Sequence, residues 1–354
     1  TALGFDNWFE DNAANLLRPG YSIARITAVD RGGFFVRTEC GETYAEIAGK
    51  FRFQIQSTID LPCVGDWVCI QCSSSGGPAI IHEVLPRKTF LRRKRPGKLM
   101  DFQMIAANID VAFIVQGCQY DFNMPRLDRY LVMANGGHIE PQIILSKTDL
   151  ISKEELTQRI EAIRNSGISA SILSLSNTTG FGLNELRDQL DPGKTYCLLG
   201  SSGVGKTTLI NRLIGQEAFE TKPVSGTGEG THTTSRRQLV ILSQGAMLID
   251  TPGMRELGII GTSDGINTGF EEFVGFSDHC RYADCSHAHE PGCAVRAAVE
   301  NGELSADRYS SYIKLKKEST HYETSYLDKR KRDKAFGRFV KSAKKQMKNK
   351  HPTN

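Results

Sequence analysis

Hydrophobic and polar positions follow two different rhythms along this chain. Between Tyr21 and about Leu85, short apolar runs are separated by turns that contain Gly, Pro or Ser. Runs of this length predict a small β-barrel, and their pattern alone does not separate an OB-fold from an SH3-like barrel. The runs cover residues 23–29, 34–37, 43–47, 64–71 and 79–84. Residues 1–20 are polar and unpatterned, and they predict a loosely held arm.

From about Ile109 the pattern changes to strands alternating with helices. Strands are expected at 109–115, 142–145, 171–175 and 195–199, and helices at 125–135, from Ser152 onward, at 183–190 and at 206–213. Ser152 and Glu155 have the spacing of a capping box. Residues 237–242 and 247–249 predict a hairpin. The alternation predicts a parallel sheet covered by helices.

Composition narrows the class of protein. A chain of 354 residues with 39% hydrophobic and 24% charged residues is typical of a soluble protein of two or three domains. No apolar run approaches the roughly 20 residues that a membrane helix needs, so no membrane partner is expected. Asp6, Glu10 and Asp11 do not fit a signal peptide, and we expect a cytoplasmic protein. Nine cysteines, three of them near residue 285, favour one metal site over disulfides.

The net charge of +4 is unevenly placed. Fourteen Lys or Arg against four Asp or Glu lie between Lys314 and Lys350. A second basic cluster, around Pro86 and Pro96, predicts a domain boundary and comprises Arg87, Lys88, Arg92, Arg93, Lys94, Arg95 and Lys98. This asymmetry favours a polyanion partner, nucleic acid before membrane, with a solvated basic tail as the alternative.

A phosphate-binding loop follows the strand 195–199. It matches G-x-x-x-x-G-K-[ST] and comprises Gly200, Ser201, Ser202, Gly203, Val204, Gly205, Lys206 and Thr207, with Thr208 next to it. The glycines let several backbone N–H groups point at one anion. Lys206 would reach the β- and γ-phosphates, and the Thr207 hydroxyl would hold Mg²⁺. The alternative is a Gly-rich turn with a solvated lysine.

Two short segments indicate guanine. Ser146, Lys147, Thr148 and Asp149 follow a predicted strand, at the edge where α/β folds bind ligands. The Asp149 carboxylate can accept from the ring N–H and the exocyclic amine of guanine. The usual pattern is N-K-x-D, and Ser146 stands in for Asn. Its shorter hydroxyl is expected not to bridge the base and the phosphate loop, at a cost of about 1 kcal/mol of nucleotide affinity. Ser176, Asn177 and Thr178 resemble the S-A-x loop beside the guanine oxygen, with Asn in place of Ala.

A third set indicates a nucleotide-dependent switch. Asp250-Thr251-Pro252-Gly253 follows a predicted strand and resembles the D-x-x-G element of GTPases. Asp250 would hold Mg²⁺ through water, and the Gly253 N–H would sense the γ-phosphate. Among His232, Thr233 and Thr234, we expect Thr233 to close on Mg²⁺, with Thr234 as the alternative.

In the C-terminal region, Cys280, Cys285, His287 and Cys293 supply three thiolates and one imidazole within fourteen residues. This is the closed ligand set of a structural zinc site. His279 and His289 are alternative ligands, and a group of buried thiols is the alternative interpretation.

The order of these elements is unusual, because the guanine segments precede the phosphate loop. In this order, together with Ala107-Asn108-Ile109-Asp110, Gly230-Thr231-His232-Thr233-Thr234 and the cysteine cluster, the chain resembles the circularly permuted ribosome-assembly GTPases of the RsgA (YjeQ/YloQ) family. The resemblance covers about residues 21–300. It implies an OB-fold before the GTPase domain, a zinc domain after it, and slow GTP hydrolysis that the small ribosomal subunit stimulates. It also implies His232 as the residue that positions water, beside the catalytic roles of Lys206 and Gly253, and its C-x-H-x-x-E-P-x-C pattern favours His287 as the zinc ligand.

The sequence therefore predicts a multidomain chain. The expected parts are an arm (1–20), an OB-fold β-barrel (21–86), a basic linker (87–108), a circularly permuted α/β GTPase domain (109–262), a zinc-binding domain (263–302) and a basic helical tail (303–354). The expected cofactors are one structural Zn²⁺, and Mg²⁺ with GTP. A monomer that binds GTP or GDP and the small subunit's rRNA is expected, with release after hydrolysis. The alternatives are an RNA-binding assembly factor with a degraded nucleotide site, and a P-loop ATPase or kinase.

Overall fold

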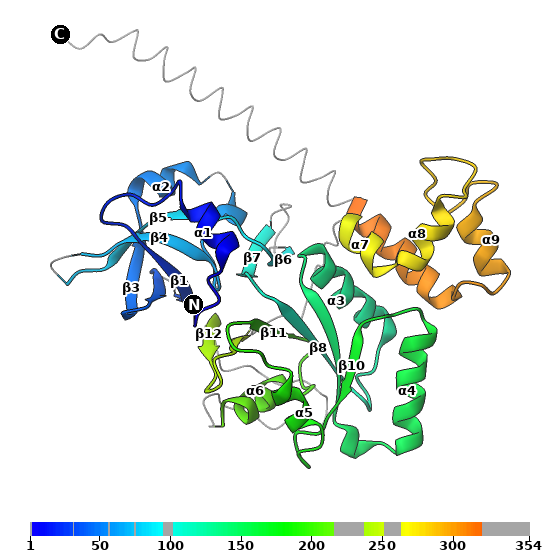
Figure 1. Ribbon diagram of the computed structural model, residues 1–354. Coiled ribbons are helices and arrows are strands. Elements are labelled where there is room, and N and C mark those ends of the chain that lie inside the picture. Colours follow the sequence, from blue (N-terminus) through cyan, green and yellow to red (C-terminus); the bar gives the residue numbers. More distant parts are fainter. Residues whose placement is uncertain are drawn as a thin grey trace, which may run out of the picture.

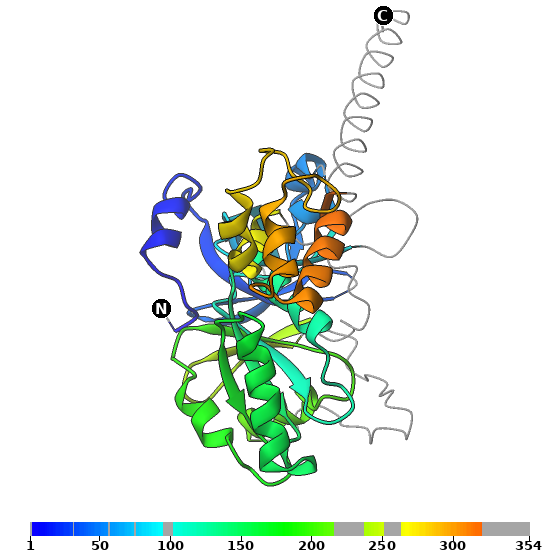
Figure 2. The same cartoon turned by 90° about the vertical axis from the view of Figure 1, so that its right-hand side faces the viewer.

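A computed structural model describes residues 2–30, 32–55, 57–73, 76–94, 102–215, 237–250 and 263–320. The chain forms an N-terminal barrel, a central α/β domain and a C-terminal helical lobe (Figure 1). In two views at right angles, the barrel and the lobe both lie above the α/β domain (Figures 1 and 2).

The N-terminal barrel has five strands. They are β1 (Ser22–Val29), β2 (Phe34–Thr38), β3 (Gly41–Ile47), β4 (Trp67–Gln71) and β5 (Ala79–Val84). The strand order is β1-β2-β3-β5-β4, and β4 pairs with β1 to close the barrel. Only the β3–β5 pair is parallel, and α2 (Gly49–Gln54) and the short helix η1 (Thr58–Asp60) connect β3 to β4. This closed Greek-key arrangement confirms the OB-fold.

The first twenty residues are held against the barrel. Helix α1 (Asn7–Ala13) begins at Asp6, whose carboxylate accepts from the Phe9 N–H. The Phe9 side chain is buried and packs against Trp67, with ring centroids 5.8 Å apart. The expectation of a loosely held arm is therefore wrong, because a few apolar side chains in a polar segment are enough to anchor it.

The region expected to be a basic linker contains a hairpin. Strands β6 (Phe90–Lys94) and β7 (Phe102–Ala107) pair in antiparallel orientation. Two members of the basic cluster are paired with acidic residues. Arg87 donates to the buried Asp66 at 2.7 Å, and Lys88 pairs with Asp6 at the surface. Asp66 thus neutralises the charge of Arg87.

The α/β domain contributes six strands. They are β8 (Val111–Gly117), β9 (Glu140–Ser146), β10 (Ser171–Ser174), β11 (Thr195–Leu199), β12 (Arg237–Ile241) and β13 (Met247–Asp250). Their order is β10-β9-β8-β11-β13-β12, in which only β12 is antiparallel to its neighbour β13. The predicted strands and hairpin are confirmed.

Helices cover both faces of this sheet (Figure 1). They are α3 (Met124–Gly136), α4 (Lys153–Asn165), α5 (Leu183–Asp188) and α6 (Lys206–Ile214), with the short helix η2 (Thr148–Leu150). Along β8, Ala112 and Ile114 pack with α3 and α4, whereas Phe113 and Val115 pack with α5 and α6. Because both faces are buried, β8 is an uninterrupted apolar run.

The barrel and the α/β domain share one continuous sheet. Strand β1 pairs with β12, with Ala28 opposite Gln238 and Val29 opposite Arg237. The hairpin β12–β13 is therefore held by backbone hydrogen bonds on both sides.

The C-terminal lobe consists of α7 (Ser263–Gly269), α8 (Glu271–Ser277), α9 (Ala294–Glu300) and a helix over 306–320. Helix α7 lies very close to α3, because a Cβ atom added at Gly265 would come within 2.5 Å of the Val132 carbonyl oxygen. Within the ranges described above, no helix is both long and apolar enough to cross a membrane.

Candidate nucleotide and metal sites

One edge of the sheet collects the predicted nucleotide residues. Strands β8, β9, β10, β11 and β13 run parallel, so their carboxyl ends lie at the same edge. The segment from Ser146 to Asp149 follows β9, residues 176–178 follow β10, the phosphate loop follows β11, and Asp250 ends β13. Ligands bind at this edge in open α/β sheets.

The phosphate loop has the backbone that its glycines permit. Gly200 and Gly205 have φ angles of 148° and 97°, which side chains rarely allow. A Cβ atom at Gly200 would also lie 2.3 Å from the Val115 carbonyl oxygen. The Lys206 amine donates to the carbonyl oxygens of Gly200 and Ser201 at 2.8 and 2.5 Å, which places its charge within the curve of the loop. A lysine charge in a glycine-rich loop that leads into the first turn of α6 suits a polyphosphate.

The two base segments are joined to each other. The Ser176 hydroxyl donates to the Asp149 carboxylate at 2.5 Å, and the Thr148 N–H donates to the Leu175 carbonyl. Lys147 has a φ angle of 60°, a conformation that costs free energy for a residue with a side chain. Strain of this kind gathers at ligand sites, and here it sets the direction in which the Asp149 turn leaves β9.

Ser146 reaches the phosphate loop after all. Its side chain is fully buried, and its hydroxyl donates to the Val204 carbonyl at 2.8 Å, with the Gln116 carbonyl 3.2 Å away. The loop half of the expected bridge is therefore made by a serine, because β9 ends close enough to the loop.

A carboxylate that no sequence motif indicates lies beside the phosphate loop. Asp121, in the turn after β8, accepts from the Ser201 hydroxyl and from Arg126, both at 2.5 Å. Asp121 and Ser201 are eighty positions apart, and no spacing pattern connects them. Their contact follows only from the pairing of β8 with β11.

Several predicted switch residues, Thr233, Gly253 and the proposed water-positioning His232, lie outside the described residues. Thr207 is the second residue of α6. Asp250 lies at the end of β13, opposite Gln238 of β12. A hydroxyl and a carboxylate at one sheet edge are oxygen donors of the kind that Mg²⁺ prefers.

The lobe gathers Cys280, Cys285, His287 and Cys293, whose ligand atoms all lie within 4.8 Å of one another. The Nδ1 atom of His287 is 3.6 Å from the sulfur atoms of both Cys280 and Cys293, and these two sulfur atoms are 4.0 Å apart. Tetrahedral zinc, with Zn–S of about 2.3 Å and Zn–N of about 2.0 Å, separates its ligands by about 3.5–3.8 Å. The cluster therefore fits a metal ion of this kind. The alternative ligands His279 and His289 are exposed and are not part of the group.

Neighbouring groups fix the orientation of His287. The Nε2 atom of His287 is 3.2 Å from the Ser277 hydroxyl, and the Tyr309 hydroxyl donates to the His287 carbonyl at 2.6 Å. Hydrogen bonds from Ser286 hold the pKa of Glu290 far below its usual range, so this carboxylate stays charged. Its contacts with the Ser286 N–H and hydroxyl join the two ends of the segment 286–290. Outer partners of this type orient metal ligands.

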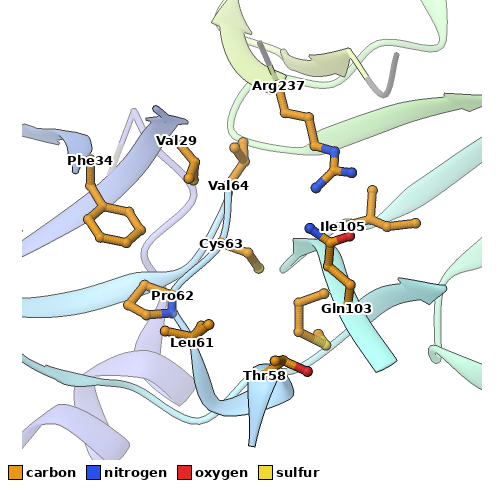
Figure 3. Close-up of a pocket in the computed structure, with 11 residues that line it drawn as sticks. Val29, Phe34, Thr58, Leu61, Pro62, Cys63, Val64, Gln103, Ile105 and Arg237 are labelled. Carbon is orange, nitrogen blue, oxygen red and sulfur yellow. The ribbon is translucent and has the colours of Figure 1, made fainter. Parts of the chain in front are cut away.

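A cavity of about 260 Å³ lies where the barrel, β7 and β12 meet (Figure 3). Arg237 and Gln103 point toward each other across it, and Cys63 lies between the barrel and β7. Burial raises the pKa of the Cys63 thiol well above its usual value, so the thiol is uncharged. None of the described residues that line the cavity is a carboxylate or an imidazole. The cavity lies at the seam between the barrel and the α/β domain, at the end of β12 that begins with Arg237.

Comparison with known proteins agrees with this architecture. Residues 84–260 match a model of the RsgA GTPase family. The chain is 40% identical over 321 residues to the small ribosomal subunit biogenesis GTPase RsgA 2 of Lactiplantibacillus plantarum, covering 90% of each chain. It is 36% identical over 331 residues to the corresponding RsgA protein of Opitutus terrae, covering 91% of this chain and 90% of that protein.

Solved structures give the same result. The crystal structure of YjeQ from Thermotoga maritima superimposes with a TM-score of 0.63 at 28% identity, covering 85% of this chain and 99% of that one. The structure of YloQ, described as a circularly permuted GTPase, superimposes with a TM-score of 0.61 at 26% identity, covering 85% of this chain and 96% of that one. By its sequence, its permuted order of elements and its fold, this chain belongs to the RsgA GTPase family.

Proposed function

We propose that this chain hydrolyses GTP during late maturation of the small ribosomal subunit, binding the subunit with GTP and leaving it after hydrolysis. Relatives at 36–40% identity are named small ribosomal subunit biogenesis GTPases. The observation that carries the proposal is the connection of the base segments to the phosphate loop. Asp149, held by Ser176, and the loop, held by Ser146, form one hydrogen-bonded unit at the sheet edge.

In this site, the two base segments recognise guanine and the loop holds the phosphates. Asp149 accepts the ring N–H and the exocyclic amine of guanine, and the stem of Lys147 lies against the base. The backbone of residues 176–178 contacts the guanine oxygen. Lys206 neutralises the β- and γ-phosphates, while the N–H groups of residues 201–208 surround them.

Mg²⁺, when bound, neutralises charge that develops on the phosphate oxygens. Thr207, Asp250 and Thr233 would hold it. His232 would orient the attacking water, and the Gly253 N–H would contact the γ-phosphate. Turnover by His232→Ala at the wild-type rate in the presence of small subunits would exclude His232 from this role.

Cys280, Cys285, His287 and Cys293 would hold one zinc ion with a structural role. Four protein ligands leave no open position for water, so the ion would stabilise the lobe and take no part in hydrolysis.

The ribosomal contact is proposed to use the barrel, the basic cluster and the basic tail. The tail residues from Lys329 to Lys350 lie outside the described residues. Contacts of this kind neutralise phosphates, so the affinity for rRNA would fall steeply as salt is raised.

The alternative of a degraded, passive nucleotide site receives no support at Ser146 and Asn177. Both residues hydrogen-bond to the phosphate loop. A site that had lost its function would not be expected to keep such contacts.

The test is GTP hydrolysis with and without purified small subunits, using Lys206→Ala as the inactive control. We expect slow turnover alone and a clear increase with subunits, and competition by GDP but not by ATP. Turnover that subunits leave unchanged would contradict the ribosomal part of the proposal. Equal competition by ATP would contradict guanine selectivity.

A further inference from the structure

The two residues that depart from the usual guanine-site pattern contact neighbouring atoms of one loop. The Ser146 hydroxyl donates to the Val204 carbonyl at 2.8 Å, and the Asn177 amide nitrogen donates to the Gly205 carbonyl at 3.1 Å. These residues leave different strands, β9 and β10, yet their acceptors are consecutive in the phosphate loop. The two departures therefore act on the same part of the site.

The close approach at Asn177 depends on both partners. Gly205 has a φ angle of 97°, and a Cβ atom there would lie 2.8 Å from the Asn177 amide nitrogen. Alanine at 177 would have no donor for the Gly205 carbonyl. Only a longer side chain with a hydrogen-bond donor reaches from position 177 to the Gly205 carbonyl.

Asn177 also carries a cost that folding alone does not explain. Its side-chain oxygen is buried and has no hydrogen-bond partner in the part of the chain that the structure describes. A buried acceptor without a partner destabilises a protein, and such groups are uncommon unless they serve a site. The amide orientation follows from the Gly205 contact, since the carbonyl oxygen there requires a donor.

We propose that Ser146 and Asn177 form a two-part brace that positions the phosphate loop against the guanine segments. The usual pairing places a long amide on the first segment and a small residue on the second. Here the sizes are exchanged, with the small residue at 146 and the long amide at 177. The inference rests on the proposed nucleotide site, and it makes both side chains positioning residues that touch the loop.

The position of the brace determines which kinetic constant it affects. Neither hydrogen bond involves Lys206 or the segment expected to contact the γ-phosphate. Loss of the brace should therefore weaken GDP and GTP equally. The KM for GTP should rise, while the kcat stimulated by small subunits stays unchanged at saturating GTP.

The test measures GDP and GTP affinity for Asn177→Ala, Ser146→Asn and the double variant Ser146→Asn/Asn177→Ala. Asn184→Ala is the matched control, because Asn184 is exposed on α5 and its side chain contacts Arg187. One hydrogen bond is worth about 1 kcal/mol, so Asn177→Ala should weaken both nucleotides about fivefold. Ser146→Asn alone should also bind more weakly, because the added atoms enter a fully buried position beside the phosphate loop. The double variant should return to within about twofold of the wild type, since it restores the usual arrangement, with the long amide at 146 and the small residue at 177.

Melting curves without nucleotide identify a variant that is merely unstable. If Asn177→Ala binds GDP and GTP as tightly as the control Asn184→Ala does, the proposed brace is overturned and the proposed function stays in place. A double variant that binds no better than the two single losses combined would also overturn it, since the two positions would then be independent. Wild-type protein that binds no guanine nucleotide would overturn the proposed function and the brace together.

Discussion

The α/β domain is attached to its two neighbours in different ways. The barrel joins it through backbone pairing and one buried cation, whereas the C-terminal lobe joins it through helix packing and ion pairs. The two seams lie over different elements of the same domain, β12 on one side and α3 on the other (Figure 1).

At the barrel seam, Arg25 of β1 is only 2% exposed and bonds almost entirely to uncharged groups. Its guanidinium donates to the carbonyls of Leu3, Gly65 and Asn108, and to the Thr195 hydroxyl at 2.8 Å. Burial lowers the pKa of Arg25 to about 10, and the charges of Asp110 and Asp66 partly offset this. One side chain thus connects the N-terminal segment, the barrel and β11.

At the lobe seam, Arg308 is 4% exposed and bonds to charged partners. It donates to Asp128 of α3 at 2.6 Å, to Glu272 of α8 and to the Gly269 carbonyl. A second pair, Arg129 and Glu318, lies near the surface at 2.6 Å. This seam contains no strand pairing among the described residues.

The difference indicates which neighbour should respond to the nucleotide. Hairpin β12–β13 lies in the chain between the two segments predicted to be switches, and β12 pairs directly with barrel strand β1. A shift of the hairpin would therefore move the barrel through its backbone. The lobe seam is made of side chains, so the lobe should be able to unfold separately.

Removal of the metal should have the largest effect on stability, and it should affect the C-terminal lobe alone. Structural zinc contributes about 10–16 kcal/mol in small zinc domains, so a chelator should unfold the lobe while the barrel and the α/β domain stay folded. Limited proteolysis with mass spectrometry, alongside zinc analysis, would show loss of residues after about 262. Cys285→Ser should behave as the stripped protein does, while Cys72→Ser, at an exposed barrel cysteine, should retain the metal. A lobe that resists protease after the metal is lost would contradict the separation of the two seams.

Arg25→Met should destabilise the barrel and the α/β domain together. The substitution leaves several buried carbonyl oxygens without their donor, at a cost of about 3–5 kcal/mol. Urea denaturation should show one transition that moves to lower urea for both domains. The control is Arg37→Met, an exposed arginine on β2, which should change little. Two separated transitions for Arg25→Met would show that this residue does not couple the domains.

Arg308→Met should have a smaller effect, confined to the lobe. It leaves the Asp128 carboxylate buried beside Glu272, which costs about 3 kcal/mol. An early transition of the lobe, followed by tryptic cleavage after 262, would be the signature. Arg296→Met breaks an exposed pair with Glu300 and should cost less than about 1 kcal/mol. Equal losses from the two variants would mean that the buried pair does not hold the seam.

The sequence predicted most of the domain interiors and little of the seams. The apolar runs predicted β8 and β11, because an uninterrupted apolar run indicates a buried strand. The phosphate loop was predicted by its motif, which fixes residue types at a set spacing from Gly200 to Thr207. No local pattern indicates the role of Arg25, because its five acceptors come from distant parts of the chain. The β6–β7 hairpin was missed because its basic residues outweighed its strand pattern. Contacts between elements depend on the three-dimensional arrangement, which one sequence does not encode locally.

The smallest predicted effect is a pH dependence that belongs to the lobe seam alone. Burial raises the pKa of Asp128 from 3.8 to about 6, and the Arg308 charge only partly opposes this. A raised folded-state pKa means that the stabilising contribution of the protonated form is present below pH 3.8 and is lost as the pH rises through 6. Lowering the pH from 7 to 5 should therefore improve the free energy of unfolding of the wild type, relative to Asp128→Asn, by about 1 kcal/mol. Urea midpoints of the two proteins at both pH values give this difference, and other titrating groups cancel. A difference that changes in the opposite direction would mean that Arg308 keeps Asp128 charged, and that the two seams differ less than their contacts suggest.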